Sequence, residues 1–329
     1  MSIGGDLPLV APATVAPSKG VSHSGVPKGG RVRRLTGADR LVVIVMVTIP
    51  LILTMIFVVL PALASVILSF SSWDGIGGFD KIKWIGFTNY ENVFTNYPPF
   101  WPAMQHNLLW LAMMFFVATP LGMFLAVLLD KEMRGGRLYQ TPIYLPVVLS
   151  LALVGFIWQL QYSRDFGLLN AILQYFHLQS PDAPVDWFGD PSISLWAVMV
   201  AAAWRHAGYI MLLYLAGLKG VDPSLREACA VDGASGVQTF FRVVFPVLRP
   251  INIIVVVITV IESLRAFDLV WIVNKGGNGL ELISALVTLN VVGEASRIGF
   301  GSALATIMLV ISVVFIAIYL ATIFREEEQ

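Results

Sequence analysis

The chain has 329 residues, of which 57% are hydrophobic and only 13% are charged. Water-soluble domains carry about 25% charged residues, so this composition excludes a soluble enzyme and predicts an integral membrane protein. The 21 basic residues balance the 21 acidic ones, which leaves no excess charge for binding nucleic acid. A single cysteine, Cys229, excludes an internal disulfide and any multi-cysteine metal site.

The chain begins with residues 1–40, which are expected to form a flexible cytoplasmic tail. The first 30 of them are rich in Pro, Gly, Ser and Ala and show no helical periodicity. Six apolar runs follow, each long enough to cross a hydrocarbon core of about 30 Å as a helix, and none alternates in polarity as a membrane strand would. The expected fold class is an all-α membrane protein with six transmembrane helices, at about residues 41–70, 107–129, 142–162, 193–215, 251–273 and 303–324.

The basic residues predict how these spans are oriented. Fourteen of the 21 lie in the tail, in the connections after the second and fourth spans, and at the C-terminal end. Five lie in the other connections, and Arg205 and Arg265 fall within spans. Because cytoplasmic segments of membrane proteins are enriched in Lys and Arg, both termini are expected in the cytoplasm. Residues 71–103 then form an extracytoplasmic loop.

The connection between the fourth and fifth spans, residues 219–246, predicts two short helices around a glycine turn. Asp222 and Pro223 suit the start of the first helix, and Ser224 with Glu227 has the spacing of a capping box. Gly233 suits the left-handed position that ends such a helix, and residues 238–244 form a second short helix. A structured elbow rich in small residues is typical of a surface on which another protein docks.

This connection resembles the EAA motif of permeases in binding-protein-dependent ABC importers. The matching residues are Glu227-Ala228-Cys229, then Gly233, then Val243-Val-Phe245-Pro246, with Cys229 at a position where alanine is usual. The segments 61–70, 87–94, 214–218, 267–270 and 299–303 resemble carbohydrate permeases of the maltose-permease F-subunit type. The resemblance implies the type I ABC importer permease fold, with a transmembrane permease domain at about residues 104–324.

The resemblance also implies partners. It implies a second homologous permease, usually a different chain, together with two ATPase subunits under the elbows and an extracytoplasmic sugar-binding protein. ATP and Mg²⁺ would be bound by the ATPases, since this chain has no Gly-x-x-x-x-Gly-Lys-Ser/Thr loop, and no cofactor, metal or catalytic residue is expected here. Glu227 is the expected docking acid; alternatively it only completes the capping box. The residues implied in ATPase coupling are Glu227, Ala228, Cys229, Asp232, Gly233, Ala234 and Pro246.

Charged residues within the spans are the candidates for the substrate pathway. Glu262, Arg265 and Asp268 follow one another at spacings of three, which places them on one broad face of a continuous fifth helix. Charges at membrane depth are costly and normally face protein or water, so this face lines a sugar pathway or forms an internal neutralising network. Arg205 and Trp204 in the fourth span are further candidates, and Arg205 is alternatively an ionic partner for one of the acids.

Two other functions compete with the pathway subunit. A secondary transporter would couple uptake to an ion through Glu262 or Asp268, but such proteins often contain an inverted repeat, and the sequence shows none. A membrane enzyme would need a catalytic motif such as His-Glu-x-x-His or Gly-x-Ser-x-Gly, and neither occurs. The sequence leaves the transported sugar open among oligosaccharides, disaccharides and glycerol-3-phosphate.

Overall fold

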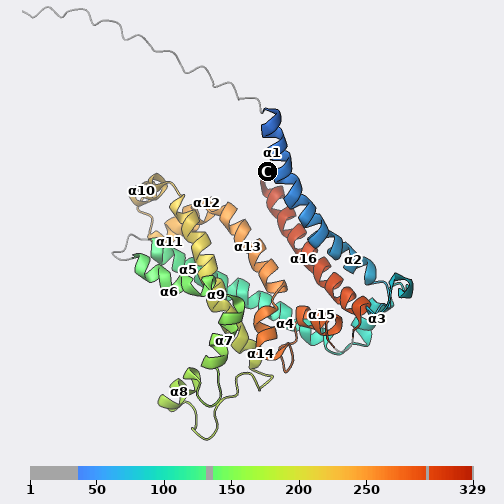
Figure 1. The fold of residues 1–329 in the computed structure, drawn as a ribbon. Coiled ribbons are helices and arrows are strands. Elements are labelled where there is room, and N and C mark those ends of the chain that lie inside the picture. Colours follow the sequence, from blue (N-terminus) through green and yellow to red (C-terminus); the bar gives the residue numbers. More distant parts are fainter. Residues whose placement is uncertain (1–35, 131–135, 294–295, 328–329) are drawn as a thin grey trace, which may run out of the picture. The chain divides into compact units, whose positions relative to one another are not determined.

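The structure is a computed structural model that describes residues 36–130, 136–293 and 296–327. Within these ranges the chain is helical, and its extended pairing is limited to one isolated bridge between Ser71 and Trp84. The chain divides into two units, residues 1–56 and 57–329. Figure 1 shows its helices in the order of the sequence. The all-α prediction is therefore confirmed for the described residues.

The first unit consists of helix α1, Gly37–Thr54. Thr36 caps it, because its side chain accepts a hydrogen bond from the Asp39 N–H while the Asp39 carboxylate accepts one from the Thr36 N–H. The helix starts before residue 41, so Gly37–Arg40 are helical and do not belong to a tail. Residues 1–35 of the predicted tail lie outside the described residues.

The second unit holds all the other helices. In chain order they are α2 (Leu60–Leu68), α3 (Thr88–Thr95), α4 (Phe100–Met113), α5 (Thr119–Asp130), α6 (Gly136–Val148), α7 (Leu151–Gln161), α8 (Leu168–Tyr175), α9 (Ser194–Lys219), α10 (Pro223–Val231), α11 (Gly236–Thr239), α12 (Phe245–Val247), α13 (Arg249–Leu264), α14 (Asp268–Asn274), α15 (Ile283–Val291) and α16 (Ile298–Glu327). Three π-helical turns, η1 (Met55–Val59), η3 (Met114–Ala118) and η4 (Phe240–Val244), join helices that follow one another directly.

Among the described residues, four helical stretches are long and apolar enough to cross a membrane, and two bent pairs raise the number to as many as six. The four are Asp39–Leu68, Phe100–Asp130, Ser194–Lys219 and Ile298–Ala321. They correspond to the first, second, fourth and sixth predicted spans. The third predicted span, residues 142–162, corresponds to the bent pair Leu138–Val148 with Leu151–Gln161 at 104°. The fifth, residues 251–273, lies within the second helix of the other pair, Gly236–Val247 with Arg249–Asn274 at 77°, so that bend comes before the predicted span.

Both bends have local causes in the sequence. Between α6 and α7, the hydroxyl of Ser150 accepts a hydrogen bond from the Leu153 N–H at 3.2 Å and so starts a new helix. Before α13, Leu248 leaves the helical conformation, and Pro250 occupies the first turn of the helix that follows. Hydropathy averages over such a cap, and for that reason the first pair appears as one straight run in the sequence, whereas the turn at Leu248 falls between the predicted elbow and the predicted fifth span.

Helix α9 is the centre of the second unit, and most of its span is buried by neighbouring helices. Two glycines bring it close to helices on either side. A Cβ on Gly208 would lie 2.5 Å from the Ile143 carbonyl oxygen of α6, and a Cβ on Gly122 of α5 would lie 2.6 Å from the Ala207 carbonyl oxygen. Small residues that let helix backbones approach are the usual means of packing helices in lipid, where the hydrophobic effect between helices is absent.

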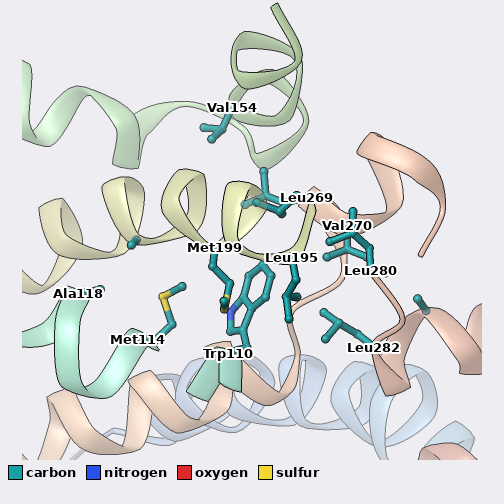
Figure 2. Packing of buried hydrophobic residues seen from close by; sticks show 13 residues of the cluster. Trp110, Met114, Ala118, Val154, Leu195, Met199, Leu269, Val270, Leu280 and Leu282 are labelled. Carbon is teal, nitrogen blue, oxygen red and sulfur yellow. The ribbon is translucent and has the colours of Figure 1, made fainter. Parts of the chain in front are cut away.

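Side chains from α4, η3, α7, α9 and α14 form a buried cluster at the N-terminal half of α9. Figure 2 shows Trp110 of α4 beside Met199 and Leu195 of α9, with Leu269 and Val270 of α14 on the other side of α9. This cluster holds α14 against α9 and α7. It therefore determines where the residues just before α14 lie.

Candidate functional site

A pocket of about 240 Å³ lies where α13 ends and α14 begins. Helix α13 ends at Leu264, and Asp268 is the first residue of α14, so Arg265 lies in the break between the two helices. The predicted continuous helix face carrying Glu262, Arg265 and Asp268 is therefore replaced by a break in the helix. All three side chains still line one pocket.

A hydrogen bond from a neighbouring helix reaches the break. The Ser284 hydroxyl of α15 donates to the carbonyl oxygen of Ala266 within the break. A backbone group freed by a broken helix needs such a partner in the membrane, because hydrocarbon offers none.

Helix α9 supplies Arg205 and His206 to the same pocket. His206 is buried, and its Nε2 lies 3.2 Å from the hydroxyl of Thr259, which in turn lies 3.2 Å from the hydroxyl of Thr119. This chain of contacts fixes α9, α13 and α5 to one another. The Nε of Arg205 is buried and has no hydrogen-bond partner among the described residues.

The charges around the pocket do not neutralise one another directly. Among the described residues, no ion pair within 4.0 Å joins Arg205 or Arg265 to Glu262 or Asp268. Glu262, Arg265 and Asp268 are exposed, and Arg205 is half-buried. This arrangement favours the pathway interpretation over the internal network, because a structural network would show paired charges.

Two aromatic side chains that the sequence analysis did not select complete the pocket. Trp110 and Phe267 line it, and Phe267 is stacked on Trp271 with ring centroids 5.2 Å apart. Trp204, which was a candidate, does not line it; its ring packs against Trp158 at 5.8 Å. Neighbouring residues on α9 point to different sides, so Trp204 turns away where Arg205 turns in.

A second pocket, of about 330 Å³, shares Arg205, His206 and Glu262 with the first. It continues past Tyr209 on α9 and Ile258 on α13. The first pocket extends in the other direction, to α14. The shared residues therefore lie between two cavities that follow α9 and α13.

The elbow of residues 219–246 lies at the other end of α9 from α14 (Figure 1). Asp222 caps α10 by accepting a hydrogen bond from the Ser224 N–H at 2.9 Å, and this bond lowers the pKa of the Asp222 carboxyl. The expected capping box of Ser224 and Glu227 is not formed, since Asp222 already occupies the cap position. Gly233 has φ +74°, the left-handed conformation that was predicted.

The second elbow helix has a capping box that the sequence analysis missed. The Ser235 hydroxyl accepts from the Gln238 N–H, and the Gln238 side chain accepts from the Ser235 N–H. The sequence carries the pattern of a capping box, Ser235-x-x-Gln238, directly after the glycine turn. It starts α11 at Gly236, two residues before the predicted helix.

An ion pair ties the elbow to the membrane-spanning helices. Arg226 Nη1 of α10 donates to Asp130 Oδ2, the last residue of α5, at 2.6 Å. Its Nη2 donates to the Leu218 carbonyl oxygen near the end of α9 at 3.4 Å. One side chain thus contacts the ends of α5 and α9, which follow the second and fourth predicted spans.

The exposed residues of the elbow include the acid Glu227 and several large apolar side chains. Glu227 is exposed and makes no hydrogen bond or ion pair within the described part of the chain. Val231, Val237 and Phe241 are 88%, 69% and 58% exposed. Of the other predicted coupling residues, Ala228, Asp232, Gly233 and Pro246 are exposed, and Cys229 and Ala234 are half-buried. Large apolar side chains exposed on one short connection are typical of a protein–protein contact.

The comparisons with known proteins decide the family. Residues 25–326 match the model of the binding-protein-dependent transport system inner membrane component. The chain belongs to this family. A probable ABC transporter permease protein of Pyrococcus horikoshii is 30% identical over 288 residues, covering 87% of this chain and 97% of that protein.

The chain is also similar to a sugar import permease and to a chain in a solved ABC transporter structure. A xylose/arabinose import permease protein of Haloferax volcanii is 31% identical, covering 77% of this chain and 78% of that protein. The crystal structure of a bacterial alginate ABC transporter, in complex with an alginate pentasaccharide-bound periplasmic protein, contains a chain with the same fold. Its TM-score is 0.73 at 20% sequence identity, covering 86% of this chain and 93% of that one. The chain is thus an ABC transporter permease of the inner membrane with the fold of ABC importer permeases.

Proposed function

We propose that this permease forms half of the translocation pathway of an ATP-driven sugar importer. The observation that carries the proposal is the break between α13 and α14, which places Glu262, Arg265 and Asp268 opposite Arg205 around one pocket without pairing them. Carboxylates and guanidinium groups left unpaired at membrane depth can exchange hydrogen bonds with sugar hydroxyls, and an aromatic ring such as Phe267 can cover a sugar face. Relatives and structural neighbours with sugars in their names support this class of substrate.

The charges of the pocket favour a neutral sugar. Two acids, Glu262 and Asp268, face two arginines, Arg205 and Arg265, so the formal charges of these four residues cancel. A phosphorylated substrate such as glycerol-3-phosphate would need an excess of positive charge. Among the sugars left open by the sequence, we therefore favour an uncharged disaccharide or oligosaccharide.

We further propose that the elbow is the site at which an ATPase subunit docks. Glu227 would meet a basic residue of the ATPase, and Val231, Val237 and Phe241 would be buried in the contact. ATP and Mg²⁺ would be bound and ATP hydrolysed in two such subunits, while this chain has no cofactor and no catalytic residue of its own. A second, homologous permease would supply the other half of the pathway in a heterodimer.

The two sites would operate as one alternating-access device. Sugar would enter from an extracytoplasmic binding protein when ATP closes the ATPases, and it would be released to the cytoplasm after hydrolysis. The Asp130–Arg226 pair would carry motion of the elbow to α5 and α9. The ATPases could then switch access to the pocket through contacts alone, without chemistry in this chain.

The proposal is tested in proteoliposomes that contain the whole complex and its binding protein. Asp268→Asn keeps the size of the side chain but removes its charge, and we expect uptake to fall by about tenfold or more while the ATPase subunits still co-purify. Asp165→Asn, an exposed acid beyond the end of α7, is the matched control and should leave uptake unchanged. Normal uptake by Asp268→Asn would show that the pocket is not the pathway.

A further inference from the structure

A separate pocket of about 280 Å³ lies at the ends of α2 and α16. Trp73 and Asp74 approach it from the segment after α2, Asn92 from α3, and Arg297 and Phe300 from the start of α16. None of these residues lines the pocket at the α13–α14 break or belongs to the elbow. The proposed transport cycle therefore gives this pocket no role.

The position of this pocket along the chain places it at the depth of lipid headgroups. One candidate span ends at Leu68, four residues before the pocket begins at Ser72. Another candidate span begins at Ile298, between the lining residues Arg297 and Phe300. Residues that flank the ends of spans lie at the membrane–water interface, and aromatic side chains are enriched there.

Hydrogen bonds hold the walls of the pocket in place. The buried Asn89 amide donates to the carbonyl oxygens of Ser69 and Ser71 at 2.8 and 2.7 Å, which shapes the chain after α2. The Gly299 N–H donates to the Trp73 carbonyl oxygen at 2.9 Å. Gly299 has no room for a Cβ, because one would lie 2.0 Å from the Ser71 carbonyl oxygen. The pocket is thus a built feature of three packed segments.

Two rings form one side of the pocket. Tyr97 and Phe300 pack edge to face with their centroids 5.1 Å apart, and the Asn290 amide donates to the Tyr97 hydroxyl at 3.0 Å. The Arg297 guanidinium carbon lies 5.4 Å from the centre of the Phe300 ring. These contacts place a cation and aromatic faces at the same edge of the pocket.

Opposite charges line this pocket without forming an ion pair. In the part of the chain that the structure describes, no carboxylate lies within 4.0 Å of the Arg297 guanidinium, and Asp74 makes no ion pair. One oxygen of Asp74 accepts a hydrogen bond from the Ile76 N–H at 2.9 Å. A ligand that carries both a negative and a positive group could satisfy both side chains at once.

We propose that this pocket binds the zwitterionic headgroup of a membrane phospholipid, one with a phosphate and a primary ammonium. Arg297 would donate to the phosphate in charge-assisted hydrogen bonds. Asp74 would accept from the ammonium, and the rings of Tyr97 and Trp73 would lie beside it as cation–π partners. The proposal depends on the membrane location of the chain and not on the sugar pathway.

The experiment measures which lipids stay bound to the intact complex. The complex is extracted in mild detergent and exchanged into mixed micelles of phosphatidylethanolamine, phosphatidylcholine and phosphatidylglycerol in equal amounts, and bound lipid is measured by native mass spectrometry. The wild type should retain phosphatidylethanolamine preferentially. The choline group of phosphatidylcholine has no N–H that could donate a hydrogen bond to Asp74. The glycerol group of phosphatidylglycerol has no positive charge.

The variants separate the two halves of the headgroup. Arg297→Gln should lower retained phosphatidylethanolamine by about fivefold or more, since a phosphate contact is lost. Asp74→Asn should instead reduce the preference for phosphatidylethanolamine over the other two lipids. Arg164→Gln, an exposed basic residue after α7, is the control and should behave as the wild type. Equal retention of all three lipids by the wild type, or unchanged retention by Arg297→Gln, would overturn the proposal, as would release of the lipid by a neutral sugar.

Discussion

The ion pair between Asp130 and Arg226 offers a quantitative test of how the elbow is attached. Its side chains are 13% and 38% exposed, and the contact is 2.6 Å long. Exposed pairs contribute about 0.2–1 kcal/mol, and breaking a buried pair costs about 3–5 kcal/mol. For this partly buried geometry we expect about 1–2 kcal/mol, which corresponds to a factor of about 5–30 in the ratio of attached to detached elbow.

Three variants measure this energy as a double-mutant cycle. Arg226→Gln and Asp130→Asn each leave one charge without its partner, and the double variant removes both. The readout is the ATPase rate stimulated by sugar-loaded binding protein in the reconstituted complex, because that rate depends on motion passing between the pocket and the ATPases. Each single variant should lose stimulation by about 5- to 30-fold, and the double variant should lose less than the two losses combined.

Two results would contradict this description of the elbow. Single variants with normal stimulation would show that the pair does not attach the elbow to α5. Losses that simply add in the double variant would show that Asp130 and Arg226 act independently, despite their 2.6 Å contact. Arg164→Gln, far along the chain from the elbow, controls for the loss of a positive charge and should retain full stimulation.

Three further predictions concern the elbow and the packing around α9. Glu227→Lys should abolish uptake while the chain still inserts in the membrane, because the exposed carboxylate of Glu227 is the proposed docking acid. Cys229→Ala is the control and should leave uptake intact. Normal transport by Glu227→Lys would show that Glu227 is not part of the docking site. Gly122→Ala should destabilise the complex by about 1–3 kcal/mol in detergent melting, since its Cβ would meet the Ala207 carbonyl oxygen at 2.6 Å, whereas Gly236→Ala has open space and should not. The hydrogen bond from the Ser224 N–H lowers the pKa of the Asp222 carboxyl below its ordinary value of 3.8. The ionised cap therefore stabilises the elbow at every pH above 3.8, and this stabilisation is lost only as the pH falls below 3.8. Proteolysis of the elbow should therefore be constant from about pH 5 to 8 in the wild type and faster throughout in Asp222→Ala; a pH step within that range would implicate another group.

The parts of the fold that depend on long apolar runs could be predicted from the sequence. Residues 41–70 and 193–215 appear as single candidate spans within a few residues of the expected bounds. The bend within the third span, residues 142–162, could not be predicted, because the Ser150 cap interrupts the helix without interrupting the hydropathy. Hydropathy reports which residues can enter the membrane and not whether their helix is straight.

The arrangement of the predicted pathway residues could not be derived from their spacing in the sequence. Spacings of three suggested one helix face for Glu262, Arg265 and Asp268, and the structure gathers them instead at a helix break that Ser284 contacts. Trp204 was predicted because it is next to Arg205 in the sequence, but its ring packs against Trp158.

In the elbow, the motif indicated Glu227 and Gly233. The contact of Arg226 with Asp130 joins residues 96 positions apart, a separation that no local pattern reveals.

The most direct measurement is co-purification from the native host. The tagged chain is extracted in mild detergent, and its stoichiometric partners are identified by mass spectrometry, with Glu227→Lys purified in parallel. An importer subunit should recover an ATPase and a second permease, and Glu227→Lys should lose the ATPase while keeping the second permease. Recovery of the chain alone, together with uptake that persists without ATP, would contradict the pathway-subunit function and make Glu262 and Asp268 candidates for ion coupling.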